Sequence, residues 1–388
     1  MSAATSGPLD RENGHVVVVG GGLATARLCT VLRRKKFAGP ITVLSAEAVP
    51  PYDRPPLSKA VLAGDRDETP LPFDTAKLGA DLRLSTRAIG LDPGTRTVRT
   101  DAGDVAYDAL AIATGASPVR LPGDGPQHTL RTLDDALGLR KELVPGARVV
   151  IVGAGWIGAE VATAARSAGC RVTCVEVGPE PLTGPLGEVA GAATRPWWAG
   201  IDLRTATAVR SVEPDGVHLA DGAVLPADVV VSGVGVRPET GWLAGSGIAT
   251  DRGILTDTRC RTGVPGVVAL GDVAQRWSAH TGSHRLVEHW DDASTAATAA
   301  AASLLDWEQG PEHDPVPYFW SDQFGRKLQY VGAHHPADDL ALDRTGDGAL
   351  VRAIWSRDGV LTAWLGVDRS KDLVTARTAV GGPVSALA

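Results

Sequence analysis

The sequence predicts an α/β protein with two parallel-sheet units and a smaller C-terminal region of α+β structure. Two observations lead to this prediction. Short β-branched apolar runs recur along the chain, and two of them lead directly into a glycine-rich turn followed by a helix pattern. Such uninterrupted runs are typical of strands buried on both faces of a parallel sheet. From about residue 316 the pattern changes to alternating strands with glycine turns.

The first unit starts with a strand predicted from His15 to Val19. Three glycines follow at positions 20 to 22, and the segment from Leu23 to Arg34 predicts a helix. Ile41 to Leu44 is the next apolar run. This unit is therefore expected to have the order strand, turn, helix, strand.

The same order recurs in the second unit. A strand is predicted at Arg148 to Val152, and Gly-Ala-Gly-Trp-Ile-Gly occupies positions 153 to 158. A helix is predicted from Ile157 to Ala168 and another strand from Arg171 to Val175. The two units therefore indicate a duplicated plan. Further apolar strands are predicted at Ala109–Ala113, Val229–Ser232 and Val267–Leu270.

Composition restricts the class of protein. The 388 residues are 44% hydrophobic and 21% charged, which is an ordinary balance for a folded globular chain. A net charge of −7 argues against a general nucleic-acid binder, and no apolar run is long enough to cross a membrane as a helix. The polar N-terminus lacks a secretion segment, so a cytoplasmic location is expected. The cysteines, at 29, 170, 174 and 260, include no Cys-x-x-Cys pair and no zinc spacing, so neither a redox dithiol nor a metal site is expected, and the thiols are expected to be buried and structural.

The second glycine turn predicts a dinucleotide site. At the start of a helix, free backbone N–H groups can bind an anion, and glycines let a pyrophosphate approach them. Gly153, Gly155 and Gly158 complete the pattern Gly-x-Gly-x-x-Gly, and Glu176 ends the next strand. An acid at that position, about 20 residues on, binds the adenosine ribose hydroxyls. Because a carboxylate repels a 2′-phosphate, and Glu180 rather than an Arg follows, we expect NADH rather than NADPH.

The first glycine turn predicts a second nucleotide. Its third glycine is replaced by Thr25, and Glu47 is the nearest acid after the following strand. Two other strand ends support this site: Ala113-Thr114-Gly115 forms a tight turn, and Gly271-Asp272 offers a carboxylate to a ribityl chain. These three pieces together predict FAD at the first turn.

With these motifs, the sequence resembles the pyridine nucleotide-disulfide oxidoreductase superfamily, and within it the ferredoxin reductases of bacterial oxygenase systems, of the putidaredoxin reductase and biphenyl dioxygenase reductase type. The resemblance extends over about 14 to 365. The runs that carry it are Pro51-Tyr-Asp-Arg-Pro-Pro-Leu-Ser-Lys59, Arg285-Leu-Val-Glu-His-Trp290 and Pro317-Tyr-Phe-Trp-Ser-Asp-Gln323. It implies two Rossmann-like domains, one for FAD (14–118 and 247–315) and one for NAD (119–246), followed by a C-terminal α+β domain (316–388).

The resemblance also implies roles for single residues. Lys59 is expected beside flavin N5, paired with Glu160 of the second helix as the catalytic pair. The segment at Glu288 begins a helix expected to face the flavin pyrimidine. The expected FAD-binding residues are Gly20, Gly22, Leu23, Ala24, Glu47, Arg54, Lys59, Ala113, Thr114, Gly115, Arg131, Gly271, Asp272, Glu288, His289, Trp290 and Trp320. The expected NAD-binding residues are Gly153, Gly155, Trp156, Ile157, Gly158, Glu176 and Gly235.

The implied activity is an NADH-dependent ferredoxin reductase. Electrons would pass from NADH through FAD, one at a time, to a [2Fe–2S] ferredoxin that supplies an oxygenase. The run from 51 to 59 contains no cysteine, which argues against disulfide and peroxide reductases. A flavin-dependent NADH oxidase and a biosynthetic oxidoreductase acting on a small molecule remain as alternatives. A flavoprotein of the apoptosis-inducing factor kind is opposed by the acidic net charge, and neither nucleic acid nor a membrane is expected as a partner.

Several residues keep two interpretations at this point. Lys59 is either the flavin partner or a solvated lysine, His289 either a flavin contact or a satisfied helix histidine, and Trp320 either a flavin contact or a core indole. The run from Arg33 to Lys36 is either a solvated helix end or a docking patch for an acidic ferredoxin.

Two departures from the family pattern also stand out. Glu180 takes the place of an Arg that the family often has near the adenine, and the pair Trp197-Trp198 is unusual. All ten Trp of the chain lie at or beyond Trp156, and no role is assigned to Trp197-Trp198.

Overall fold

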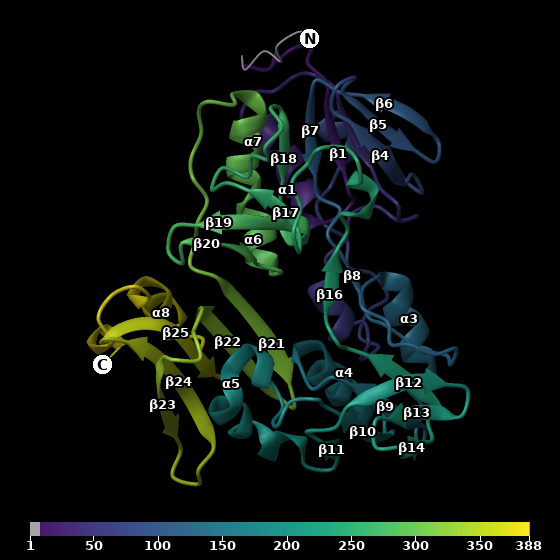
Figure 1. The fold of residues 1–388 in the computed structure, drawn as a ribbon, viewed down its shortest axis with the longest axis vertical. Helices are drawn as coiled ribbons and strands as arrows, with labels where there is room; N and C mark the ends of the chain where they lie inside the picture. Colours follow the sequence, from purple (N-terminus) through teal and green to yellow (C-terminus); the bar gives the residue numbers. More distant parts are fainter. Residues whose placement is uncertain (1–7, 388) are drawn as a thin grey trace. The chain divides into compact units, whose positions relative to one another are not determined.

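The computed structural model describes residues 8–387, which form two compact units (Figure 1). The first unit contains residues 8–53, Thr69–Ser117 and Arg237–Pro315, and the second contains Arg54–Glu68, Pro118–Val236 and 316–387. The chain passes between the units several times, so neither unit is one continuous stretch of sequence. The short strands β8 (Ala116–Pro118) and β16 (Val236–Pro238) contain two of these crossings.

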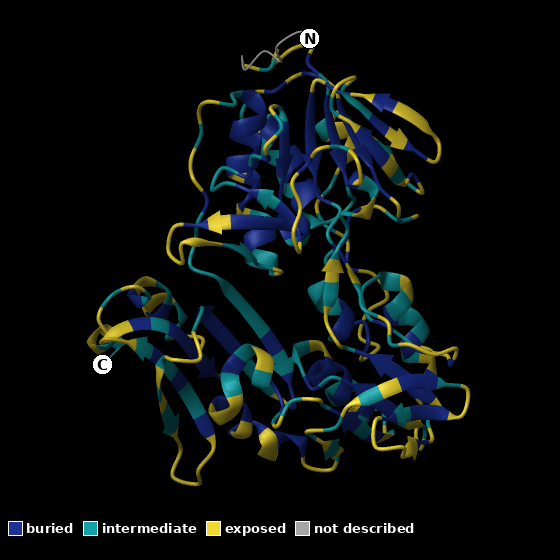
Figure 2. Cartoon of the chain, viewed as in Figure 1, coloured by how far each residue is buried: buried dark blue, intermediate teal, exposed yellow. Residues whose placement is uncertain are grey.

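The first unit is built on a five-stranded sheet in which all neighbouring strands are parallel. Every residue of its central strand is buried, as the run of four valines predicts (Figure 2). In order across the sheet, the strands are β18 (Val267–Ala269), β7 (Ala109–Ile112), β1 (Val16–Val19), β2 (Ile41–Leu44) and β3 (Ala80–Arg83).

The two faces of this sheet are covered by different layers. Val16 and Val18 pack with the helices, and Val17 and Val19 pack on the opposite face, because successive side chains of a strand point to opposite sides. The helical layer consists of α1 (Leu23–Arg34), α6 (Trp290–Thr295) and α7 (Ala297–Leu305), and the other layer is the antiparallel sheet β4 (Ala88–Asp92), β5 (Thr97–Thr100) and β6 (Gly103–Ala106). Smaller elements of this unit are α2 (Thr75–Leu78), β17 (Ile254–Thr256), β19 (Ala274–Ser278), β20 (Ser283–Leu286), η3 (Gly241–Leu243) and η4 (Gly271–Val273).

The second unit repeats the three-layer plan around a four-stranded parallel sheet. Its strands, in order, are β11 (Asp202–Arg204), β10 (Arg171–Val175), β9 (Arg148–Val152) and β15 (Val229–Ser232). One face packs against α3 (Leu133–Glu142), α4 (Trp156–Ser167) and α5 (Thr183–Ala192), and the other against β12 (Val209–Glu213), β13 (Gly216–Leu219) and β14 (Val224–Leu225).

The C-terminal segment adds a five-stranded antiparallel sheet to the second unit. Along β25, Ala363 and Leu365 join the core that contains α4 and α5, whereas Trp364 faces α8 and is fully buried. The strands, in order, are β21 (Tyr318–Gln323), β22 (Arg326–Gly332), β25 (Val360–Val367), β24 (Leu350–Arg357) and β23 (Asp339–Arg344), and the helix is α8 (Leu373–Ala379). Three 3-10 turns complete the unit: η1 (Pro55–Ser58), η2 (Arg195–Trp198) and η5 (Val384–Leu387).

The unusual pair Trp197-Trp198 belongs to the core of this unit. Both side chains are buried; the Trp198 ring meets Phe324 edge-on with the ring centroids 4.9 Å apart, and the Arg326 guanidinium lies 5.2 Å from the centroid of Trp197. These indoles therefore join η2 to the C-terminal sheet.

The predicted fold class is confirmed, and the main elements agree closely with the sequence. Helix α1 and strands β2, β9 and β10 have the predicted bounds, while α4 begins and ends one residue earlier than expected and β1 starts at Val16 rather than His15. The boundaries of the three predicted domains stay a prediction.

Candidate dinucleotide sites and the Lys59–Glu160 pair

The second glycine turn lies between β9 and α4. Gly153 has φ of +103°, and a Cβ there would be 2.5 Å from the carbonyl oxygen of Gly233. A Cβ on Gly158 would be 1.9 Å from the carbonyl oxygen of Gly153, so the helix can pack this close only without a side chain. At Gly155 a Cβ would meet no protein atom within 4 Å, which leaves the helix N-terminus open to a pyrophosphate.

Glu176 follows β10 and closes this turn. Its Oε2 accepts a hydrogen bond of 2.7 Å from the N–H of Ala154, and its Oε1 accepts one of 2.7 Å from the N–H of Gly178. A carboxylate has acceptor sites beyond these two, so the side chain is fixed in place and can still bind ribose hydroxyls. This arrangement fits the adenosine half of a nicotinamide dinucleotide.

The first glycine turn joins β1 to α1. A Cβ on Gly20 would be 2.1 Å from the carbonyl oxygen of Ala113, and a Cβ on Gly22 would meet nothing within 4 Å. Thr25 stands where the second turn needs Gly158, and its hydroxyl donates a hydrogen bond of 2.6 Å to the carbonyl oxygen of Gly20. The threonine is fully buried, so this turn is closed by a hydrogen bond instead of by close backbone packing.

The segments that follow two other strands, β18 and β7, lie at the same end of the sheet as this turn. Gly271 has φ of +72°, and a Cβ on it would be 3.3 Å from the Cβ of Ala24 in the first turn of α1. This contact places Asp272 at the same end of the sheet as the glycine turn. The Thr114 hydroxyl donates to the carbonyl oxygen of Glu239 at 2.9 Å, which fixes the loop after β7. The carboxyl ends of β1, β7 and β18 thus form one cradle, and its residues fit a second dinucleotide.

Helix α6 carries a buried ion cluster behind the segment expected to face the flavin. Asp292 accepts two hydrogen bonds from Arg276, of 2.6 and 3.1 Å, and its Oδ1 lies 3.2 Å from Nε2 of His313. Ahead of it, Trp290 Nε1 donates to Asp53 Oδ1 at 2.7 Å, and His289 occupies the N-cap position of the helix. Burial lowers the pKa of His289, which favours the neutral imidazole.

Lys59 and Glu160 form an ion pair in the second unit. Lys59 Nζ lies 2.9 Å from Oε1 of Glu160 and donates a hydrogen bond of 2.9 Å to Oε2. The carboxylate is only 3% exposed, and it also accepts from the Ser58 hydroxyl, from Ser321 Oγ at 2.6 Å and from the N–H of Asp322 at 3.1 Å. The predicted pairing of these two side chains is present in the structure, and the lysine is not a freely solvated one.

The serines at Glu160 were missed at the level of the sequence. Ser58 and Ser321 lie 102 and 161 positions from the glutamate, so no local pattern relates them to it. The available signal was their place inside the two family runs, Pro-Pro-Leu-Ser-Lys and Trp-Ser-Asp-Gln.

The remaining expected FAD residues fall in both units. Glu47 follows β2 and accepts a hydrogen bond of 2.6 Å from the Tyr52 hydroxyl. Arg54 belongs to the second unit, where it donates to the carbonyl oxygen of Arg131 at 2.5 Å. Trp320 lies on β21 of the same unit and stacks on Tyr318, with 6.1 Å between the ring centroids. The remaining members Leu23, Gly115 and Glu288 lie in the first unit.

The remaining expected NAD residues all lie in the second unit. Trp156 begins α4, and its ring meets Phe319 of β21 edge-on at 4.6 Å. Ile157 follows it and is exposed. Gly235 has φ of +104°, and its carbonyl accepts from the N–H of Val119 at 3.0 Å.

Two sequence interpretations need correction. Arg33 is not part of a solvated helix end, because it donates hydrogen bonds to four carbonyl oxygens, those of Phe37, Gly39, Leu78 and Gly79. Cys170 is half-buried rather than buried, and its thiol donates to the carbonyl oxygen of Val144 at 3.3 Å. The other three cysteines are buried as expected.

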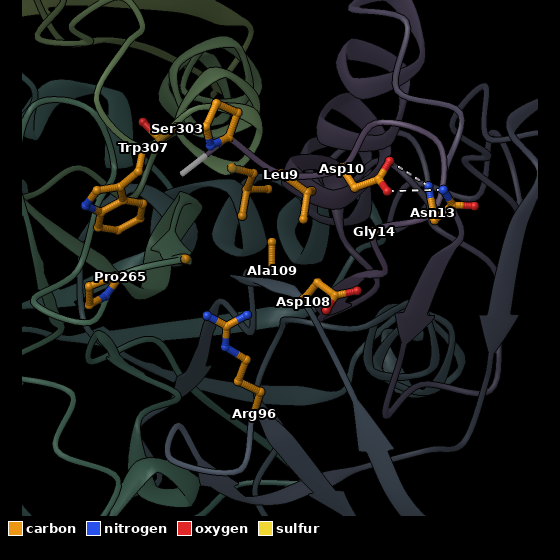
Figure 3. Close-up of a pocket in the computed structure, with 13 residues that line it drawn as sticks. Leu9, Asp10, Asn13, Gly14, Arg96, Asp108, Ala109, Pro265, Ser303 and Trp307 are labelled. Carbon is orange, nitrogen blue, oxygen red and sulfur yellow. Dashed lines mark hydrogen bonds between the residues drawn. The ribbon is translucent and has the colours of Figure 1, made fainter. Parts of the chain in front are cut away.

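A cavity of about 340 Å³ lies elsewhere in the first unit (Figure 3). It is lined by Leu9, Arg96, Asp108 and Trp307 among others. Ala109, another lining residue, is the first residue of β7, so the cavity lies at the amino ends of the strands. The glycine cradle lies at their carboxyl ends, and the cavity is therefore not part of the dinucleotide site.

Within residues 8–387, no helix is long and apolar enough to cross a membrane. Over the same described residues, no group of three or more His, Cys, Asp or Glu side chains is arranged to hold a metal ion.

The two glycine cradles at the carboxyl ends of parallel sheets define a class of enzyme, the oxidoreductases that bind two dinucleotides. Comparison with known families agrees with this class: the model of the family described as pyridine nucleotide-disulphide oxidoreductase matches residues 14–297, and the model described as reductase C-terminal matches 318–386. The chain belongs to the pyridine nucleotide-disulphide oxidoreductase family.

Similar proteins match over nearly the whole chain. The biphenyl dioxygenase system ferredoxin–NAD(+) reductase component of Paraburkholderia xenovorans is 34% identical, over 95% of this chain and 94% of its own. Among solved structures, Fdr9 has a TM-score of 0.92 at 50% identity, covering 97% of this chain and 99% of its own. The covalent complex of putidaredoxin reductase with putidaredoxin gives 0.90 at 28% identity, covering 97% and 96%.

Proposed function

We propose that this chain is an NADH-dependent ferredoxin reductase that uses FAD to pass electrons, one at a time, to a [2Fe–2S] ferredoxin supplying an oxygenase. The observation that carries the proposal is the pair of glycine cradles in one chain, one for each dinucleotide. The acceptor is proposed because relatives named as ferredoxin–NAD(+) reductase components are similar to the chain over most of its length.

The two cradles would bind and orient the nucleotides. When bound, FAD accepts a hydride from NADH and releases the two electrons singly. Gly22 leaves the start of α1 open to the FAD pyrophosphate, Gly20 allows the turn to pass close to the Ala113 carbonyl, and Asp272 would provide an acceptor for a ribityl hydroxyl. Glu176, held by the N–H groups of Ala154 and Gly178, accepts hydrogen bonds from the ribose of NADH.

Lys59 and Glu160 are proposed as the catalytic pair. The three other donors and the lysine saturate a carboxylate that is nearly inaccessible to water, so the position of the ammonium group is determined by fixed partners. A fixed positive charge stabilises negative charge that develops near it, and it does so more strongly where water is excluded. This property supports a role in hydride transfer from NADH.

The cysteines support direct transfer without a thiol relay. Burial raises the pKa of Cys29 to about 12 and that of Cys260 to about 12, and it also raises the pKa of Cys174. Because a thiolate is the reactive form, these thiols are inert near neutral pH. This chemistry favours a ferredoxin reductase over a disulfide reductase.

Anaerobic stopped-flow spectroscopy tests the proposal. Holoenzyme is first reduced with one equivalent of NADH, and an oxidised [2Fe–2S] ferredoxin is then added. We expect rapid flavin reduction, prompt reduction of two ferredoxins per flavin, and slow oxygen consumption when ferredoxin is omitted. Docking is proposed to be electrostatic, so the ferredoxin step is expected to depend on ionic strength while the NADH step does not.

The same experiment distinguishes the alternatives. Fast peroxide production without an acceptor, together with no transfer to any [2Fe–2S] ferredoxin, would favour an NADH oxidase. Absence of flavin reduction by NADH would contradict the proposed donor.

A further inference from the structure

The loop that follows Glu176, at the adenosine end of the NAD cradle, carries Glu180, which forms an ion pair with Arg195 of η2. Arg195 Nε donates a hydrogen bond of 2.7 Å to Oε2 of Glu180. The same guanidinium donates to Thr205 Oγ1 at 2.9 Å and to the carbonyl oxygen of Pro179 at 3.2 Å. The Arg195 guanidinium therefore binds Glu180 and Pro179 in the loop after Glu176, and Thr205 in the segment after β11.

This loop is tied to the glycine turn and to Glu176. The N–H of Leu182 donates to the carbonyl oxygen of Ala154 at 3.0 Å, while the N–H of Gly178 donates to Glu176. Ala206, next to the Arg195 partner Thr205, donates its N–H to the carbonyl oxygen of Gly178 at 2.7 Å. These hydrogen bonds link the residues that bind the guanidinium to the segment that carries Glu176, the carboxylate proposed to bind the adenosine ribose.

Glu180 is itself held in place. Its N–H donates to Thr183 Oγ1 at 3.1 Å, and its carbonyl accepts from the same hydroxyl at 2.7 Å. Its Cβ packs over Gly191 of α5, where a side chain would collide with the carbonyl oxygen of Pro181 at 2.5 Å. The carboxylate that pairs with Arg195 is therefore presented by a fixed backbone and is only 19% exposed.

We infer that the Glu180–Arg195 pair is a second determinant of cofactor choice, which acts against NADPH. The inference rests on the proposed use of NADH at this cradle. A guanidinium is the side chain best suited to bind a 2′-phosphate through paired N–H donors. Here that guanidinium is neutralised by Glu180 and turned toward Thr205 and Pro179, so it is withheld from a phosphate. Glu176 repels the 2′-phosphate directly, and Glu180 removes the cation that would compensate.

The test measures binding of NAD⁺ and NADP⁺ to oxidised holoenzyme by isothermal titration calorimetry, which needs no turnover and no ferredoxin. In Glu180→Gln, which keeps side-chain length, we expect NADP⁺ to bind about tenfold more tightly, a change of about 1.4 kcal/mol, while NAD⁺ binding changes by less than about twofold. Adding Arg195→Ala to this variant is expected to abolish the gain. Arg195→Ala alone is expected to leave NADP⁺ binding unchanged.

Asp202→Asn is the matched control. It also removes one negative charge and releases an arginine, because Asp202 pairs with Arg204 on the exposed edge strand β11 at 2.8 Å. An equal gain in this control, or no gain in Glu180→Gln, would overturn the inference. The experiment separates this inference from the proposed function. If the parent binds NAD⁺ but Glu180→Gln does not bind NADP⁺ more tightly, only the inference is overturned. If the parent does not bind NAD⁺, both are overturned. Glu180→Ala serves as the second variant if Glu180→Gln folds poorly, as judged by its thermal midpoint.

Discussion

The most constrained side chain of the proposed catalytic pair is Glu160, not Lys59. Burying a carboxylate costs several kcal/mol unless donors replace its water. Four donors surround this one, and Lys59 is the only one of them that carries a charge. Ser58 and Ser321 therefore act as positioning residues, since they determine the rotamer of Glu160 and through it the position of the ammonium group.

Replacing Lys59 tests the proposed role of this charge. Lys59→Met keeps the aliphatic stem and removes the ammonium group, so transition-state stabilisation by that charge is lost. We expect anaerobic flavin reduction by NADH to slow by at least about tenfold, which corresponds to about 1.4 kcal/mol. Stopped-flow absorbance of the flavin measures the rate. Lys77→Met, which removes a lysine that is 85% exposed, is the control. A rate in Lys59→Met equal to that of the parent would remove Lys59 from the mechanism.

At the scale of the element, the two glycine turns solve one packing problem differently. In the second turn, Gly158 lets α4 approach β9 because no side chain intervenes. In the first turn, Thr25 takes that position and fills the space with a hydroxyl that binds the Gly20 carbonyl. We therefore expect the first turn to be destabilised when the Thr25 side chain is removed, and the second turn to be destabilised when a side chain is added at Gly158.

We expect Gly158→Ala to destabilise the second unit, because its Cβ would overlap the carbonyl oxygen of Gly153 and force the turn apart. Overpacking of this kind costs about 1–3 kcal/mol, and it should also weaken NAD⁺ binding. Gly138→Ala, at a site in helix α3 where a Cβ meets nothing within 4 Å, is the control and is expected to be neutral or stabilising. Calorimetry of NAD⁺ binding and thermal melts measure both effects; unchanged binding in Gly158→Ala would show that the turn tolerates the side chain.

Arg33 links the end of α1 to the segment that contains α2. Its hydrogen bonds to four carbonyl oxygens satisfy groups that a helix end and a loop would otherwise leave to water. We expect Arg33→Met to lower the thermal midpoint by several degrees, because a hydrogen bond to a charged group makes a net contribution of about 1.5–3 kcal/mol. Arg34→Met, which alters the exposed neighbour, should have little effect on stability. If Arg33→Met and Arg34→Met have the same thermal midpoint but only one of them slows ferredoxin reduction, the interpretation of Arg33 to Lys36 as a docking patch for ferredoxin would hold instead.

At the scale of the whole molecule, the sequence predicts the repeated layers well because their signals are local. Four valines in β1 and the glycine turns determine strand, turn and helix within about 30 residues. The contacts at Glu160, the carbonyls bound by Arg33 and the pairing of Arg195 with Glu180 and Thr205 depend on tertiary placement. Trp197-Trp198 likewise has no local signal for its partners Arg326 and Phe324. Local periodicity therefore predicts the cradles, whereas the residues that position their side chains need the three-dimensional structure.

The buried cluster of Arg276, Asp292 and His313 has a consequence for the stability of the molecule in acid. It joins β19, α6 and the segment after α7, so its loss should affect the cooperative unfolding of the first unit. Burial raises the pKa of Asp292, but hydrogen bonds from His313 and Arg276 outweigh burial and leave the pKa below its ordinary value. The stabilisation is therefore fully present above the ordinary carboxyl pKa of about 4 and is lost as the pH falls below it.

Asp292→Asn tests this coupling. At pH 7 the variant leaves the Arg276 charge buried without its anion, which costs about 3–5 kcal/mol, so the thermal midpoint should fall markedly. Between pH 5 and pH 3 the midpoint of the parent should fall more steeply than that of the variant, because the variant has no carboxyl to protonate at this position. Asp228→Asn is the matched control: Arg148 holds the pKa of that carboxyl to about 2, but the pair is on the surface and should contribute far less at pH 7. Differential scanning calorimetry over this pH range measures both differences. Parallel pH profiles for the parent and Asp292→Asn would show that Asp292 is not ionised in the folded state, and the cluster would then be a network of neutral hydrogen bonds to an arginine.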